Sequence, residues 1–121
     1  MAHSSFYEYA NTNRIFKHYT FSGVGSEAIK AKGVSFSSYP GMLESLDDFY
    51  LMSSGLAMTQ TSNNVFDNSL LDLITPRSLL AWQRVRTASL LAGSGGEWAA
   101  AFAKQASGTY VNQYMVSPAP P

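Results

Sequence analysis

Two adjacent carboxylates, Asp47 and Asp48, run directly into the aromatic pair Phe49-Tyr50 and are the first candidates for chemistry. Carboxylate pairs can act as general acid and base, or can hold a metal ion. If the pair begins a strand, the successive side chains point to opposite faces of the sheet, so the two groups cannot share a proton. The spacing therefore favours a structural role, in which the carboxylates accept hydrogen bonds from turn N–H groups before the strand. One of the two can still point into a pocket.

Residue spacing gives little support to a metal site or to serine catalysis. The two histidines, His3 and His18, lack HxxxH or HxH spacing, which argues against a zinc site. The serines lie in no GxSxG motif, and GVG and GSGG lack the lysine and the strand–helix context of a phosphate loop. Arg84 and Arg86 lie beside Trp82 on a predicted helix, where a solvated or ion-paired face is the expected role. We therefore expect neither a metal ion nor a cofactor.

The composition is that of a globular domain with little net charge and therefore a weak electrostatic field. The chain has 121 residues, of which 45% are hydrophobic, and this suits one domain with a core. Eight basic residues balance eight acidic ones, and no basic stripe favours nucleic acid or an anionic membrane surface. Cysteine is absent, which excludes a disulfide or a thiolate site within the chain. No secretory signal is found at MAHSSFYEY, and no apolar run reaches the ~18–20 residues of a membrane span.

The elements that must position any site begin with a predicted helix over residues 4–19, ending near Phe21. Ser4 or Ser5 is its expected cap, and its apolar face carries Phe6, Tyr9, Ala10, Phe16 and Tyr19. A short strand is predicted at VSFSS (34–38), stopped by the turn residues Tyr39-Pro40-Gly41. FYLMSS and LAMTQTS, joined through Gly55, predict an antiparallel hairpin.

Two helices and a strand are predicted in the second half. Thr75 is the expected N-cap of the first helix, with Pro76 at its first position and Gly93 after its end, with positive φ. A second helix is predicted over 96–106, with Trp98 and Phe102 one turn apart, and a closing strand over 109–116. We expect residues 1–116 to form one domain and residues 117–121 a proline-rich flexible tail. The order indicates a mixed fold with antiparallel strands and a helical layer.

Several long strings, taken together, carry a resemblance to a known family. They are FSSYPG at 36–41, ESLDDFYLMSSGL at 44–56, LLAWQRVR at 79–86, SGTYVNQYM at 107–115 and HSSFYEYANTNRIFKHYTF at 3–21. In this order and near these spacings they resemble the phospholipase B-like family. The resemblance covers nearly the whole chain, and the co-occurrence of the strings is far more specific than any one of them.

The resemblance implies a fold and a chemistry. The family is similar to N-terminal nucleophile hydrolases, so the implied fold is α+β, here part of an αββα sandwich. Its members are secreted, glycosylated, lysosomal proteins described as lipid acyl hydrolases. The implied nucleophile is a cysteine exposed by autocatalytic cleavage, which attacks an acyl carbonyl with its own α-amine as base, through an acyl-enzyme. A lipid acyl substrate is therefore the implied ligand.

The implied site residues map onto this chain one by one. The family's helix opens with a pocket histidine, matched by His3, and a tryptophan three residues later, where Phe6 stands. Phenylalanine keeps a ring for substrate packing but lacks the indole N–H donor. The family's pocket threonine falls in the strand after the SSGL turn, where Thr61 or Ser62 could supply the hydroxyl.

The departures from the family pattern leave two functions open. The family's cysteine lies upstream of His3 and its oxyanion-holding Asn and Arg lie downstream of position 121, while Ala106 and Val111 replace asparagines. One interpretation is a fragment or subunit of an acyl hydrolase that supplies pocket residues. The other is an inactive relative serving as a structural or interaction subunit of a larger complex. In either case another protein chain is expected to complete the sheet and the pocket.

Overall fold

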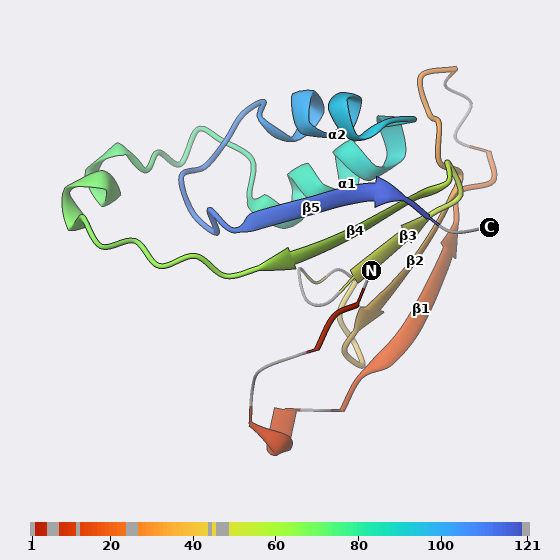
Figure 1. Ribbon diagram of the computed structural model, residues 1–121, viewed down its shortest axis with the longest axis horizontal. Helices are drawn as coiled ribbons and strands as arrows, with labels where there is room; N and C mark the ends of the chain where they lie inside the picture. Colours follow the sequence, from red (N-terminus) through yellow and green to blue (C-terminus); the bar gives the residue numbers. More distant parts are fainter. Residues whose placement is uncertain are drawn as a thin grey trace.

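The computed structural model describes residues 2–4, 8–11, 13–23, 27–43, 45 and 49–119. Within these residues one antiparallel sheet has the strand order β1-β2-β3-β4-β5 (Figure 1). The strands are β1 (Ile15–Thr20), β2 (Gly33–Ser38), β3 (Phe49–Met52), β4 (Leu56–Thr61) and β5 (Gln113–Pro118). The helices are α1 (Ala81–Leu91) and α2 (Gly95–Phe102), with short 3₁₀ turns η1 (Tyr9–Asn11) and η2 (Asn68–Leu73). The expected α+β class is confirmed.

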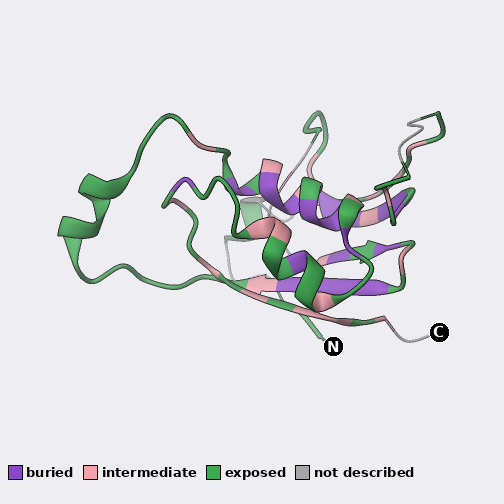
Figure 2. Cartoon of the chain, turned by 90° about the horizontal axis from the view of Figure 1, so that it is seen from above, coloured by how far each residue is buried: buried purple, intermediate pink, exposed green. Residues whose placement is uncertain are grey.

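The core lies between the helices and one face of the sheet. Directly paired residues share a face, so the register Phe36–Tyr50–Met58 carries one apolar row across three strands. Val85 and Ala88 of α1, its C-cap Ala92 and Trp98 of α2 cover this row in the same cluster. Figure 2 shows buried residues along the strands and on the helices. Each large side chain buried here contributes roughly 1.5–3 kcal/mol relative to exposure.

The hairpin predicted between residues 49 and 62 is confirmed. Gly55 has a φ of 82°, a left-handed conformation that glycine adopts without a Cβ clash, and its N–H donates to the Met52 carbonyl at 3.0 Å. The strand predicted over 34–38 is likewise confirmed, as part of β2. The turn residues and the short apolar runs were sufficient to predict both elements from the sequence.

The helix predicted over residues 4–19 is wrong. Residues 9–11 form η1 and residues 15–20 form β1, which pairs antiparallel with β2. Phe16 and Tyr19 lie three residues apart, as on a helix, whereas Ile15, Tyr19 and Phe21 fit a period of 2, and pairing with β2 decides between the two periods. The ring of Tyr19 then packs edge-on against Phe36, with ring centroids 5.1 Å apart. Ser5 and Phe6 lie outside the described residues.

The start predicted for the first long helix is also wrong. Helix α1 begins at Ala81, with Leu80 as the cap residue, whose N–H donates to Gln83 Oε1 at 2.9 Å. Thr75 Oγ1 instead accepts a bond from the Arg77 N–H at 3.3 Å, in a local turn that does not continue into the helix. Gly93 follows the C-cap Ala92, but it is not among the glycines with positive φ.

The second helix and the closing strand are confirmed with shifted bounds. Ser94 caps α2, since its Oγ accepts from the Glu97 N–H at 3.3 Å, and the helix ends at Phe102. The rings of Trp98 and Phe102 stack with centroids 4.8 Å apart. Strand β5 runs through Pro118, opposite Leu56 of β4, and so includes the start of the predicted tail. Residues 120–121 lie outside the described part.

Candidate functional site

A long segment between β4 and α1 forms one side of the candidate site. In Figure 1 it extends away from the sheet, carries η2 at its far end and returns to α1. Asp67 caps η2, because its Oδ1 accepts bonds from the Ser69 hydroxyl at 2.6 Å and the Ser69 N–H at 3.0 Å. These two hydrogen bonds lower the pKa of the Asp67 carboxyl. The returning chain is tethered by the Leu79 N–H, which donates to the Gln105 carbonyl at 2.9 Å.

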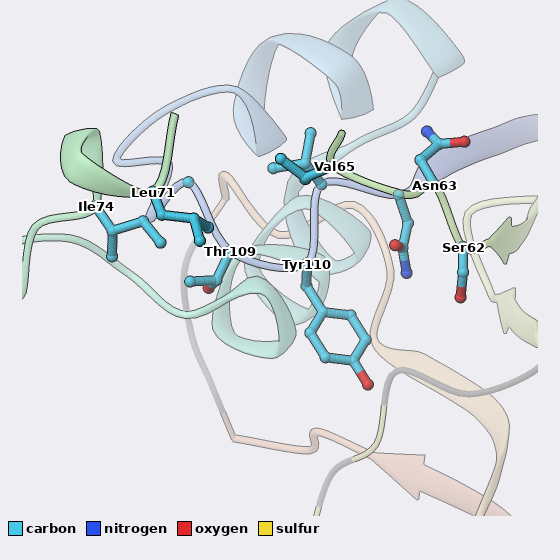
Figure 3. Close-up of a pocket in the computed structure, with 10 residues that line it drawn as sticks. Ser62, Asn63, Val65, Leu71, Ile74, Thr109 and Tyr110 are labelled. Carbon is cyan, nitrogen blue, oxygen red and sulfur yellow. The ribbon is translucent and has the colours of Figure 1, made fainter. Parts of the chain in front are cut away.

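A pocket of about 360 Å³ lies between this segment and residues 108–112. Ser62 and Asn63, where the chain leaves β4, give one end polar side chains. At the other end Leu71 and Ile74 give an apolar surface beside Thr109, whose hydroxyl is bonded to Ser107 Oγ at 2.8 Å (Figure 3). Val65 lies between the two ends. This arrangement suits a ligand with one polar and one apolar end, because each part then meets its own kind of surface.

Residues 108–112 form a fixed wall of the pocket. Gly108 and Tyr110 have φ values of 78° and 54°, and the left-handed conformation at Tyr110 is costly for a bulky residue. The Tyr110 carbonyl accepts bonds from the Asn112 N–H at 2.8 Å and from the Tyr114 hydroxyl at 3.2 Å. The Asn112 amide donates to Gln60 Oε1 at 2.6 Å, which ties the wall to β4. These bonds hold the strained conformation in place.

Arg84 lies inside the fold, near Tyr114, whose hydroxyl bonds to the wall. Its side chain is 5% exposed, its Nη1 donates to the Phe102 carbonyl at 2.8 Å and its guanidinium lies 4.2 Å from the Phe102 ring centroid. Burial lowers the pKa of Arg84, and the nearby Tyr114 opposes that change. Burial raises the pKa of Tyr114, opposed by the Arg84 charge, so the phenol keeps the proton that it donates to Tyr110. The solvated face predicted for Arg84 is therefore wrong.

Arg86 also packs against aromatic side chains. Its guanidinium carbon lies 5.1 Å from the ring centroid of Tyr19 and 5.2 Å from that of Phe36. Both arginines of α1 therefore use their planar heads on ring faces, which a lysine would do less well. In the sequence the neighbouring aromatic residue is Trp82, whereas the rings that contact the two guanidinium groups belong to β1, β2 and α2.

The candidate site residues named from the sequence lie in different parts of the structure. Thr61 is the last residue of β4, exposed and opposite Gln113, while Ser62 follows it and lines the polar end of the pocket. His3 is exposed and is not among the residues that line the pocket. Phe6 lies outside the described residues, as do Asp47 and Asp48. Of the two hydroxyl candidates, Ser62 is the one in a pocket.

Several residues of the site carried no clear signal in the sequence. Leu71 and Ile74 belong to an apolar run without helical or strand period, and Tyr110 fell within a predicted strand. Thr59 of β4 does not line the pocket, and within the described residues its hydroxyl is buried without a hydrogen-bond partner. The signal that could have found the wall is Ser107-Gly108, since a glycine with positive φ marks a turn before the strand.

The described residues contain no group of three or more His, Asp or Glu side chains placed to hold a metal ion. None of their helices is long and apolar enough to cross a bilayer.

Comparison with known proteins identifies the family. The phospholipase B family model matches residues 1–119. The chain is 57% identical to bovine phospholipase B-like 1 and 55% identical to the human protein of that name, over 95% of this chain in each case. Phospholipase B-like protein B of Dictyostelium discoideum is 44% identical. The chain spans about a fifth of the length of these relatives, 20–21% of each. On the match over residues 1–119, the chain belongs to the phospholipase B family.

Proposed function

We propose that this chain supplies part of the active site of a phospholipase B-like acyl hydrolase. The observation that carries the proposal is the family match over residues 1–119. A second observation supports it, because Ser62 lies at the polar end of a pocket whose other end is apolar. A lipid ester or amide presents the same division, with a polar reacting group attached to an apolar chain.

The proposed reaction is acyl transfer to a cysteine followed by hydrolysis. This chain contains no cysteine, so the nucleophile comes from outside these residues. Its thiolate bonds to the acyl carbon, and collapse of the tetrahedral intermediate expels an alcohol or amine, which takes a proton from the α-ammonium group. Water then attacks the thioester, gives a proton to the α-amine and releases the fatty acid.

The residues of this chain bind and orient in that scheme. Ser62 donates a hydrogen bond to the acyl carbonyl, or to the polar group beside it, and thereby fixes the reacting carbon. Thr61 is the second hydroxyl candidate. His3 supports the nucleophile's pocket, as the family's histidine does, and Phe6 packs against the substrate in place of the family's tryptophan. None of these residues completes the mechanism without the nucleophile and the oxyanion donors.

We propose the N-terminal nucleophile type of αββα sandwich as the context for this sheet. Both helices cover one face (Figure 1), and the other face carries Phe16 and Phe49, with ring centroids 6.1 Å apart, and the exposed Leu51 and Met115. Another chain segment or partner chain is proposed to cover that face, because exposed apolar rows on a sheet attract a second layer. Secretion or a lysosomal location is proposed with the family.

An inactive structural subunit is the second candidate. It is favoured by Phe6, Ala106 and Val111, which stand where the family carries tryptophan and asparagines and so remove possible hydrogen-bond groups. In this case residues 1–119 pack as the matching residues of the family do, but they take no part in catalysis.

A chimera separates the two candidates. Residues 1–119 of this chain replace the matching span of bovine phospholipase B-like 1, and release of fatty acid from a phospholipid is compared with the parent. The hydrolase proposal predicts a rate within about tenfold of the parent, since about 1.4 kcal/mol in the barrier corresponds to that factor. A chimera that folds and melts like an active parent, yet releases no fatty acid, would support the structural subunit instead.

A further inference from the structure

We infer that the pocket between residues 62–74 and 108–112 binds one acyl chain, with the acyl carbonyl end at Ser62 and Asn63 and the methyl end at Leu71 and Ile74. The inference rests on the proposed function, and it assigns the chain-binding residues of that site.

The order of the lining residues sets the direction of the ligand. Figure 3 shows Ser62 and Asn63 at one side of the pocket, Leu71 and Ile74 at the other, and Val65 between them. A hydroxyl and an amide N–H can both donate to a carbonyl or ester oxygen, whereas Leu71 and Ile74 offer apolar surface. Thr109 lies beside them, but its hydroxyl is already bonded to Ser107 Oγ at 2.8 Å. A lipid lying in the opposite direction would leave its polar group among apolar atoms and unpaired.

The size of the pocket limits what it holds. A volume of about 360 Å³ lies near the lower end of the ~300–1,000 Å³ that small-molecule sites occupy. One acyl chain fits this range better than a whole lipid with two chains and a headgroup. The rest of a phospholipid must therefore lie outside the pocket, on the side of Ser62.

The pocket is formed before a ligand arrives. Tyr110 is held in its left-handed conformation by the bonds that its carbonyl accepts from Asn112 and Tyr114. On the opposite side Ile74 lies against Gly108, where an added Cβ would meet Ile74 Cγ1 at 3.4 Å. A backbone strained and fixed in this way beside a pocket favours a binding role over a merely connecting one.

A photoactivatable probe tests the inference in the full chain. The protein is irradiated with a fatty acid that carries a diazirine near its methyl end, and the labelled peptides are mapped by mass spectrometry. We expect the label on peptides that contain residues 65–74 and 108–112. Leu71→Asn should lower this labelling by about tenfold or more, because polar substitution in an apolar pocket discriminates strongly against the chain.

Leu70→Asn is the matched control. Leu70 and Leu71 are both leucines of η2, 51% and 50% exposed, but only Leu71 lines the pocket. Leu70→Asn should therefore label like the wild type, and equal melting temperatures of the two variants would show that folding is not the cause of the difference. Label spread over other peptides, or an equal loss in both variants, would overturn the inference.

The result is independent of the hydrolysis assay. Label at the pocket together with an inactive chimera would mean that the binding site exists and the proposed reaction does not. An active chimera without label at these peptides would keep the reaction and remove the acyl site from this pocket.

Discussion

At the scale of single residues, the structure distinguishes side chains that look alike in the sequence. Thr59 and Thr61 lie on the same face of β4. Thr59 is 3% exposed, and its hydroxyl has no hydrogen-bond partner among the described residues, whereas Thr61 is exposed at the strand end. A buried hydroxyl without a partner loses its hydrogen bonds to water and gains none in the fold.

Thr59→Val should therefore stabilise the chain. Valine keeps the shape of threonine and removes the unpaired hydroxyl, so we expect the free energy of unfolding to rise by about 1 kcal/mol. Thr61→Val is the matched control, and in urea unfolding it should change stability by less than about 0.5 kcal/mol. A loss of stability in Thr59→Val would mean that the hydroxyl has a partner.

The raised pKa of Tyr114 predicts that the stability of the fold depends on pH. Its pKa is raised from 10.0, so the folded chain holds the phenolic proton where the unfolded chain has released it. The contribution of Tyr114 to the free energy of unfolding is fully present below pH 10.0, the pKa of the group in the unfolded chain. It is lost as the pH rises through the higher pKa of the folded chain. Tyr114→Phe should therefore lose less stability than the wild type between neutral and high pH, as measured by thermal melting. Parallel curves for the two proteins would contradict this assignment.

At the scale of elements, glycines show which positions need a special backbone. Gly55→Ala should cost about 1–2 kcal/mol, because a Cβ is strained at a φ of 82° in the β3–β4 turn. Gly96→Ala, in α2 with open space around the added Cβ, should instead stabilise by up to about 1 kcal/mol. Chemical unfolding of the two variants checks both signs, and a neutral Gly55→Ala would rule out the turn described for it.

Elements with local signals were predictable, and those decided by contacts were not. Gly55 and Ser94 act through their own backbone and cap positions, so the hairpin and α2 could be read from neighbouring residues. Phe16 and Tyr19 have helical spacing, while Ile15, Tyr19 and Phe21 alternate as in a strand, and only pairing with β2 makes the segment a strand. Thr75 is a good cap by type, but its turn with Arg77 ends before α1 begins. Of the residues that line the pocket, the sequence singled out Ser62 only through the family resemblance. Leu71 and Tyr110 could not be found in this way, because they come together only through the two loops.

At the scale of the whole molecule, one face of the sheet is covered by helices and the other exposes apolar side chains. Phe16 is 64% exposed, and Leu51 and Met115 lie on the same face. Such a face associates with similar surfaces in water.

The isolated chain should therefore self-associate in solution. Sedimentation velocity over a range of concentrations should show species larger than a monomer, and Phe16→Ser combined with Leu51→Ser should shift the distribution towards the monomer. A monodisperse wild-type monomer with a cooperative melt would be inconsistent with a second layer on this face.

The proposed role of Ser62 in the site of an acyl hydrolase can be tested with two alanine variants. In the chimera with the bovine relative, Ser62→Ala is compared with Thr61→Ala for fatty acid release at low substrate concentration. The proposal predicts a fall in kcat/KM of about tenfold or more for Ser62→Ala, since one hydrogen bond to the reacting group is lost, and a smaller change for Thr61→Ala. Equal rates in the two variants, or no hydrolysis in a folded chimera of an active parent, would contradict it.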